Sequence, residues 1–394
     1  MEKKETRYVP HDLIIPILLR LPVISLLRFK CVRKSWFSLI SDSNFANSHF
    51  QITTATDTSR ILVMSNDLRK TLSIDFESKL HFTEIPSPNF LHPASDFLFD
   101  IISSCRGFIF LHHSSKFQLW NPSTGAIRQI PLSPNELNED NLCYLYGFGY
   151  DQLKDDYLVV SVSINDFDDG YSSLEFFSLK DNMWREIEGS RFPYTQSTWI
   201  DDLPRVGSLF NGNIHWLAEN IESWDNVILA FDITERKLVE MPYPDGIECE
   251  IERDEDCDLC VFGEFLSLWA IDYHNSRVEI WVMREYKVHS SWTKILFLPI
   301  NDISIEYVSL ICSTKSGNIV VADDTELAMY NNKGQLLEYK SYHEGPVKQS
   351  GNQVTAYTES LLSLPSNNVK ALEDDTNKKN EVLKYFHAPF SCSA

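Results

Sequence analysis

Cys257 and Cys260 form the only close cysteine pair in the sequence. Their Cys-x2-Cys spacing is typical of zinc sites, in which four thiolate or imidazole ligands surround the ion. Only Cys249 lies near this pair, and neither a second Cys-x2-Cys nor a paired histidine follows it. A redox role would need a thioredoxin-like βαβ context, which the surrounding sequence lacks. We therefore expect no metal and no thiol chemistry at this pair.

Other patterns that could support catalysis are incomplete. Gly147 and Gly149 lack the third glycine and the helix of a dinucleotide site, so we interpret them as a turn entering a strand. His112 and His113 are adjacent in an expected hairpin, where neighbouring side chains point to opposite faces. The sequence contains no G-x-S-x-G, H-E-x-x-H or P-loop pattern. We expect no cofactor, and a catalytic propeller stays an alternative that perturbed acids at its centre would favour.

Loops rich in aromatic and acidic residues are better candidates for recognition. Residues 192–206 read FPYTQSTWIDDLPRV and carry four side chains that we select as candidate target-binding residues: Tyr194, Trp199, Asp201 and Asp202. A second acidic loop, IECEIERDEDCD, occupies residues 247–258. Binding residues are often carried on such loops. The alternative is that these charges only keep the loops solvated.

Charge divides the chain into two unequal parts. The net charge is −21, yet residues 1–50 carry eight Lys and Arg against four Asp and Glu, which gives +4 and leaves −25 for the remainder. The acidic remainder should repel phosphates, so we expect no nucleic acid partner. A basic or mixed protein surface would complement it. Eight scattered cysteines and a charged N-terminus indicate a reducing compartment, the cytoplasm or the nucleus.

Residues 13–36, LIIPILLRLPVISLLRFKCVRKSW, form the most apolar stretch of the chain. Its longest uncharged runs, Leu13–Leu19 and Leu21–Leu27, have seven residues each. A membrane-spanning helix needs ~20, so we expect no membrane span. Apolar spacing and helix-start signals at Pro10, Pro22 and Asp42 instead predict four short helices within residues 8–50. So few residues cannot bury this many apolar side chains alone, which implies a partner, either the rest of this chain or another protein.

This N-terminal stretch resembles the F-box. The matching elements recur through residues 8–50, from Pro10 and Leu13 to Trp36 and Phe45. The resemblance implies docking to a Skp-type adaptor and, through it, to the cullin of a ubiquitin ligase. The residues that it implies for adaptor binding are Pro10, Leu13, Ile17, Leu18, Leu21, Pro22, Leu26, Phe29, Lys30, Val32, Lys34 and Trp36.

Three residues depart from the usual F-box pattern: Pro16, Ile24 and Arg33. Proline inside a helix removes one N–H and can cost ~3 kcal/mol. If the first helix starts at Asp12 or Leu13, Pro16 falls in its first turn, where the cost is small. We therefore predict a late helix start and weakened adaptor binding.

Beyond residue 58 the sequence repeats a simple unit of apolar strand, polar turn and second strand. Six such units end near Pro86, Pro131, Ile187, Pro242, Pro299 and Tyr342, in steps of 43 to 57 residues. This spacing approaches the ~40–50 residues of a four-stranded propeller blade, although a seventh blade stays open. The phrases LWNPSTGAIRQIP and YGFGYDQLKDDYLVV resemble the plant F-box-associated domain, which is a kelch-like β-propeller.

The predicted protein is mainly β, with a small all-α domain followed by a propeller. We expect an F-box domain at residues 8–50, a linker at 51–58, a propeller at 59–364 and a flexible tail at 365–394. The resemblance implies a non-catalytic substrate-recognition subunit of a Skp–cullin–F-box ligase, whose propeller binds a target protein. The alternatives are an interaction scaffold no longer coupled to a ligase, which Pro16 and Ile24 motivate, and a propeller enzyme.

Overall fold

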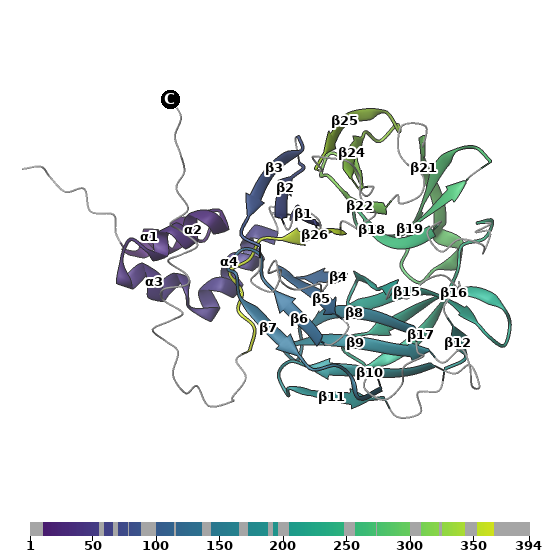
Figure 1. Ribbon diagram of the computed structural model, residues 1–394, viewed down its shortest axis with the longest axis horizontal. Coiled ribbons are helices and arrows are strands. Elements are labelled where there is room, and N and C mark those ends of the chain that lie inside the picture. Colours follow the sequence, from purple (N-terminus) through teal and green to yellow (C-terminus); the bar gives the residue numbers. More distant parts are fainter. Residues whose placement is uncertain are drawn as a thin grey trace, which may run out of the picture.

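The computed structural model of the protein describes residues 11–54, 59–65, 70–77, 79–87, 100–113, 116–135, 143–164, 172–187, 192–195, 205–247, 257–272, 274–299, 309–322, 325–342 and 353–365. Four helices form an N-terminal head, which we define as residues 11–54 (Figure 1). They are α1 (His11–Leu18), α2 (Val23–Lys30), α3 (Lys34–Ile40) and α4 (Ser43–Thr54). No helix of the described residues is long and apolar enough to cross a membrane.

The ends of α2 and α4 follow from their sequences. Pro22 directly precedes α2 with φ −56°, which suits the entry to a helix. Asp42 caps α4, because its Oδ1 accepts hydrogen bonds from the backbone N–H groups of Asn44 (3.0 Å) and Phe45 (3.1 Å). The expected cap at Asp42 is thus confirmed.

Two expectations about the head need correction. Helix α1 begins at His11 rather than at Asp12 or Leu13, so Pro16 lies inside the helix and removes one hydrogen bond there. Helix α4 continues to Thr54, through the first four residues of the predicted linker. The extension has a physical reason: Thr53 is buried and its hydroxyl donates to the carbonyl of His49 at 2.8 Å. Residues 55–58 lie outside the described residues.

The remaining described residues form six sheets, the blades of a propeller (Figure 1). Blade 1 holds β1 (Ser59–Ser65), β2 (Lys70–Asp75), β3 (His81–Ile85) and the late strand β26 (Gln353–Thr358). Blade 2 holds β4 (Asp100–Cys105), β5 (Phe108–His113), β6 (Lys116–Trp120) and β7 (Ile127–Ile130). Blade 3 holds β8 (Cys143–Asp151), β9 (Asp156–Ile164), β10 (Ser172–Ser178), β11 (Met183–Glu186) and the parallel β13 (Arg205–Val206).

Blade 4 holds β12 (Tyr194–Thr195), β14 (Ser208–Phe210), β15 (Asn213–Asn220), β16 (Asp225–Asp232) and β17 (Lys237–Pro242). Blade 5 holds β18 (Cys257–Phe262), β19 (Phe265–Asp272), β20 (Arg277–Met283) and β21 (Trp292–Pro299), with the short 3-10 helix His289–Ser291 before β21. Blade 6 holds β22 (Ser309–Ser313), β23 (Ile319–Ala322), β24 (Glu326–Tyr330) and β25 (Leu336–Ser341). The described residues of the propeller therefore form six blades.

The first blade is completed by the last strand. β26 pairs antiparallel with β1, in a register that runs from Ser59 opposite Thr358 to Met64 opposite Gln353. β26 also contacts β4 of blade 2 and β22 of blade 6, so it closes the ring from both sides. Closure of this kind leaves only short sheet edges, at the outer strands of the blades.

Asparagine or aspartate begins a hairpin turn in all six blades, including Asp75 in blade 1, whose Oδ1 accepts from the Glu77 N–H at 3.2 Å. The side chains of Asn121, Asp151, Asp232, Asp272 and Asn331 each accept hydrogen bonds from backbone N–H groups two to four residues later. These side chains mimic a backbone turn, which explains why polar turns alternate with apolar strands in the sequence.

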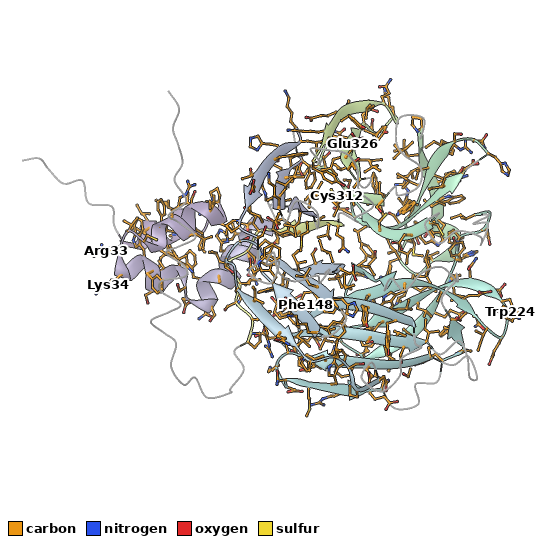
Figure 2. All side chains as sticks on the ribbon, in the orientation of Figure 1. Arg33, Lys34, Phe148, Trp224, Cys312 and Glu326 are labelled. Carbon is orange, nitrogen blue, oxygen red and sulfur yellow. The ribbon has the colours of Figure 1, made fainter. Side chains whose placement is uncertain are left out.

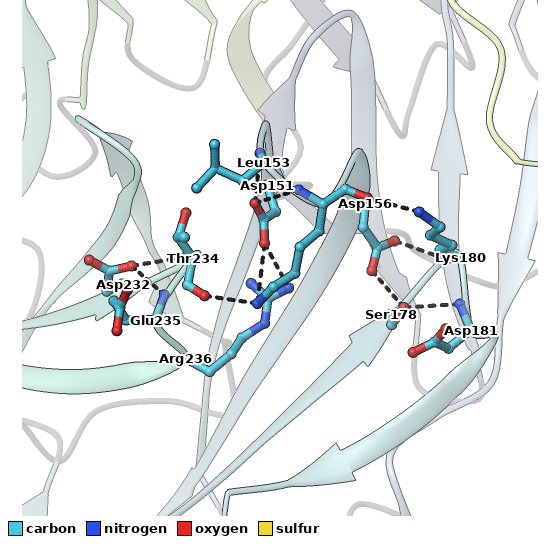
Figure 3. Close-up of polar contacts among 11 residues, drawn as sticks. Asp151, Leu153, Asp156, Ser178, Lys180, Asp181, Asp232, Thr234, Glu235 and Arg236 are labelled. Atoms are coloured by element: carbon cyan, nitrogen blue, oxygen red, sulfur yellow. Dashed lines mark hydrogen bonds and ion pairs between the residues drawn. The ribbon is translucent and has the colours of Figure 1, made fainter.

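One of these turns also ties two blades together (Figure 3). The buried carboxylate of Asp151, on blade 3, lies 3.1 Å from the guanidinium of Arg236 on blade 4. Lys154 donates from Nζ to the carbonyl of Thr234 at 2.9 Å. Burial lowers the pKa of Arg236, while the charge of Asp151 opposes that shift. An ion pair is therefore the electrostatic link between these blades.

The head and the propeller share a single hydrophobic cluster. It includes the buried head residues Leu18, Val23, Leu26, Ile40, Phe45, Ala46 and Phe50. The same cluster contains Phe108 and Phe110 of blade 2, Phe148 of blade 3, and Leu361 and Leu362, which follow β26. The head therefore has no separate core of its own among the described residues.

Candidate protein-binding surfaces

Arg106 fixes α4 to the propeller. It lies in the β4–β5 turn, and its guanidinium carbon is 3.9 Å from the ring centre of Tyr150 and 4.8 Å from that of Phe50. The guanidinium donates to Asn47 Oδ1 (3.0 Å) and to the Tyr157 hydroxyl (3.2 Å). Cation–π contacts and charged hydrogen bonds together hold the last helix of the head against blades 2 and 3.

The segment after β26 fills the junction from the other side. Asn121 donates from Nδ2 to the carbonyls of Ser360 and Leu362, both at 3.2 Å. Gly107 has φ +83°, and a Cβ there would lie 2.2 Å from the Ser360 hydroxyl oxygen. Only glycine fits so close to this segment. The junction is thus packed by three parts of the chain that are far apart in sequence.

The outer surface of the head carries apolar side chains that nothing in the described chain covers. The exposed fractions are 55% for Leu13, 53% for Ile17 and 67% for Val32. Pro22 and Lys34 are also exposed. These five were predicted to bind the adaptor, and their exposure leaves them available to a partner. Pro10 lies outside the described residues.

Two of the predicted adaptor-binding residues are placed elsewhere. Leu18 and Leu26 are only 2% and 0% exposed, because they pack into the cluster shared with the propeller. We therefore correct their assignment from contact residues to supports of the head. Helical spacing selected them because it groups residues on one face without showing what that face meets.

Four other predicted residues are half-buried: Leu21, Phe29, Lys30 and Trp36. Phe29 and Trp36 pack against each other with ring centres 5.3 Å apart, which joins α2 to α3. The carbonyl of Leu21 accepts a hydrogen bond from Nε2 of the buried His49 at 2.9 Å. Burial lowers the pKa of Lys30. These residues brace the helices and reach the surface with only part of each side chain.

Sequence reasoning missed two exposed residues on the same helices. Ile24 is 47% exposed on α2 and Phe37 is 50% exposed on α3. Ile24 was noted only as a departure from the F-box pattern. Its position one turn before Arg28, a polar residue, could have marked it as lying on the outer face. We add both to the head's apolar surface, which we define as Leu13, Ile17, Ile24, Val32 and Phe37.

Comparison with protein families matches this architecture. The model of the F-box associated beta propeller domain matches residues 51–364, most of the chain. The chain belongs to this family. An F-box/kelch-repeat protein of Arabidopsis thaliana is 26% identical over 308 residues, which cover 74% of this chain and 79% of the relative. The F-box protein CPR1 of the same plant is 26% identical over 397 residues, covering 95% and 94%.

The resemblances to the plant F-box proteins and to their propeller domain are thereby confirmed. The chain contains an F-box-associated propeller, its relatives are plant F-box proteins, and its head helices are compatible with an F-box. Among solved structures, the WD40 domain of SCAP from fission yeast covers 82% of this chain and 72% of its own, with 10% identity and a TM-score of 0.33. That score is too low to support any inference.

Only one of the four predicted target-binding residues is described. Tyr194 lies on β12 at the rim of blade 4, half-buried, and its hydroxyl donates to Glu240 Oε2 at 2.9 Å. Burial, followed by the negative charges of Glu240 and Glu222, raises the pKa of Tyr194 to about 12. Trp199, Asp201 and Asp202 lie outside the described residues.

The positions considered for metal or cofactor chemistry have structural roles in this F-box-associated propeller. Cys257 and Cys260 point to opposite faces of β18 and join different apolar clusters. Gly147 and Gly149 lie inside β8 rather than at a turn before it, which corrects our expectation. A Cβ on Gly147 would lie 2.5 Å from Ile214, so the glycine permits close packing of blades 3 and 4. Within the described ranges, no group of three or more metal-ligating side chains occurs.

The described carboxyl groups whose pKa is raised lie apart in the propeller. Burial raises the pKa of Glu219 on β15 and of Glu359 after β26, which are on different blades. Glu359 lies 3.8 Å from Arg60, so its charge has a partner. His215 is fully buried between Ser208 and Tyr286, and burial lowers its pKa to about 4. These shifts accompany packing within blades and not a shared acid–base centre.

Proposed function

We propose that this chain is the substrate-recognition subunit of a Skp–cullin–F-box ubiquitin ligase. The head docks onto a Skp-type adaptor, and the propeller binds a target protein. The chain does no bond chemistry itself, because it acts by holding target lysines near a ubiquitin-loaded enzyme carried elsewhere in the complex. The proposal places the protein in the cytoplasm or the nucleus, reducing compartments where such a complex would be found.

The observation that carries this proposal is the contrast between the two faces of the head. Its inner face is completed by the propeller, whereas its outer face exposes Leu13, Ile17, Ile24, Val32 and Phe37. A monomer has no stabilising reason to expose so many large apolar side chains within one short segment. Exposed cations at Arg20, Arg28, Arg33 and Lys34 surround them and would steer an acidic partner.

The test compares two variants, each of which removes exposed apolar side chains from a different surface of the protein. Replacing Leu13, Ile17 and Val32 by alanine should weaken binding to a purified Skp-type adaptor by at least about 30-fold, since buried interface anchors each contribute roughly 1 kcal/mol or more. The control replaces Leu336 and Leu337, which are 42% and 52% exposed on β25 of blade 6. Both variants should melt like the native chain. Equal adaptor affinity for the two variants would refute docking through this surface.

The scaffold alternative has its own observation, the position of Pro16 inside α1. We expect the Pro16→Glu variant to bind the adaptor more tightly than the native chain, because the substitution restores one helical N–H. Adaptor binding that is undetectable for the native chain and appears only in this variant would favour a scaffold uncoupled from a ligase.

A further inference from the structure

Trp224 is the most exposed tryptophan among the described residues. It ends the turn between β15 and β16 and leaves 72% of its surface open to solvent. Figure 2 shows it at the end of the molecule opposite Arg33 and Lys34 of the head. Its φ is +61°, a conformation that a bulky side chain rarely adopts. The residue therefore combines an unfavourable backbone with an unburied aromatic ring, and the fold gains no packing in return.

The turn itself does not require tryptophan. Asn220 builds it, because its side-chain oxygen accepts from the N–H groups of Glu222 (2.9 Å) and Ser223 (3.3 Å). The carbonyl of Asn220 also accepts from the Trp224 N–H at 2.7 Å. The backbone is therefore held in place, and the indole is presented on a fixed support. Strain at an exposed, well-supported position is a reason to look for a binding role.

Acidic residues lie next to Trp224 in the sequence and on strands of the same blade. Glu222 is exposed in the same turn, Asp225 is exposed at the first residue of β16, and Glu219 and Glu240 lie on β15 and β17 of the same blade. Glu240 Oε2 is fixed by the hydroxyl of Tyr194 (2.9 Å) and Nδ2 of Asn220 (3.3 Å). None of these four carboxylates forms an ion pair with a lysine or arginine within the part of the chain that the structure describes.

We propose that this rim of blade 4, formed by Tyr194, Asn220, Glu222, Trp224, Asp225 and Glu240, binds a segment of the target protein rich in lysine and arginine. One cation lies over the indole of Trp224, and neighbouring cations pair with the carboxylates. An indole is the best aromatic partner for a cation, and the unpaired carboxylates exclude nucleic acids and anionic lipid surfaces. That the bound segment belongs to a target protein rests on the proposed function. The binding of a basic peptide can be measured without the adaptor.

The probe is a fluorescein-labelled twelve-residue peptide of alternating Lys or Arg and Ser, with a peptide carrying Glu in place of each cation as its negative. Binding to the full chain is followed by fluorescence anisotropy at physiological salt. Trp224→Ala should weaken binding by at least about fivefold, in keeping with one lost cation–π contact and its packing. Glu222→Gln with Asp225→Asn should weaken it similarly and reduce its dependence on salt.

Leu153→Ala is the matched control, because Leu153 is 82% exposed at another hairpin tip, between β8 and β9. That variant should bind the basic peptide within about twofold of the native chain. Three outcomes would overturn the proposal. The native and Trp224→Ala proteins could bind the basic peptide equally well, or Trp224→Ala and Leu153→Ala could lose the same affinity. The third is that the native chain does not bind the peptide. Adaptor affinity should stay unchanged in Trp224→Ala, so failure here leaves the proposed docking of the head untouched.

Discussion

The head and the propeller differ in how their apolar surface is covered. The head consists of helices of 7 to 12 residues, and isolated helices of this length are marginal in water. Its own buried residues belong to one hydrophobic cluster with Phe108, Phe110 and Leu361 of the propeller side. The propeller instead pairs its strands in six sheets and closes them into a ring. The head shares its buried cluster with the propeller and leaves apolar side chains exposed on its outer face, whereas the described strands of the propeller are covered by neighbouring strands and blades except at the rims.

This difference shows where binding and stability are separated. In the head, a single helix carries both a residue that stabilises the fold and a residue open to a partner, since Leu26 is buried and Ile24 is exposed on α2. In the propeller, strand interiors provide the core, and turns such as the one that carries Trp224 meet solvent. A substitution in the head therefore affects folding or binding according to the face it lies on. In the propeller, a substitution inside a strand should affect folding, and a substitution in an exposed turn should affect binding.

The largest effect should come from removing the strand that both regions need. A chain that ends at residue 352 lacks β26, Leu361 and Leu362, so blade 1 loses its innermost strand and the head loses part of its support. We expect loss of the cooperative thermal transition measured by circular dichroism. A chain that ends at residue 365 is the control and should melt like the full chain. A folded shorter chain would show that the ring does not depend on β26.

The next effect separates the two faces of α2. Leu26→Ala should lower the free energy of unfolding by about 2–5 kcal/mol, because a fully buried leucine leaves a cavity in the shared cluster. Ile24→Ala should change it by less than about 0.5 kcal/mol, the usual range for exposed positions, while weakening adaptor binding. Urea denaturation of both variants gives the comparison. If the two lost equal stability, the inner and outer faces of the head would not be distinct.

The smallest effect tests the junction itself. Arg106→Gly removes the contacts to Asn47, Phe50, Tyr150 and Tyr157 while suiting the positive φ of +50° at this position. We expect a loss of about 1–2 kcal/mol, measured as faster amide hydrogen exchange in α4.

Strands on the far side of the ring provide the internal reference for that measurement. Amides of β19 and β20 in blade 5 should keep their native exchange rates in Arg106→Gly. Arg106→Ala should lose more stability than Arg106→Gly, because alanine keeps the strained backbone. Unchanged exchange in α4 would mean that the apolar cluster alone holds the head in place.

Local sequence patterns were sufficient for much of the fold. Apolar strands that alternate with polar turns predicted the propeller, since side chains such as Asp151 and Asp232 close hairpins within a few residues. The capping residue Asp42 was predicted for the same reason. Each of these features depends on neighbours in sequence, so the sequence states them directly.

Features that depend on distant residues could not be predicted in this way. Leu18 and Leu26 were assigned to the adaptor surface because nothing in their helices reveals that they are buried, in a hydrophobic cluster that also includes residues of the propeller. The extension of α4 to Thr54 was missed as well, because the sequence does not reveal that Thr53 is buried. The run of apolar residues after Ser360 was the available signal that this segment is packed. The choice of face at Leu13 and Ile17 stays a prediction, since only a bound adaptor tests it.

The position of β26 also determines when this protein can finish folding during synthesis. β1 is made early, but its partner at Gln353–Thr358 leaves the ribosome only after five other blades have been synthesised. At roughly 5–20 residues per second, β1 waits on the order of tens of seconds with an open edge. The head waits as long for Leu361 and Leu362. A chain interrupted before this point would expose apolar helices and an unpaired strand together, which are features that protein quality control recognises.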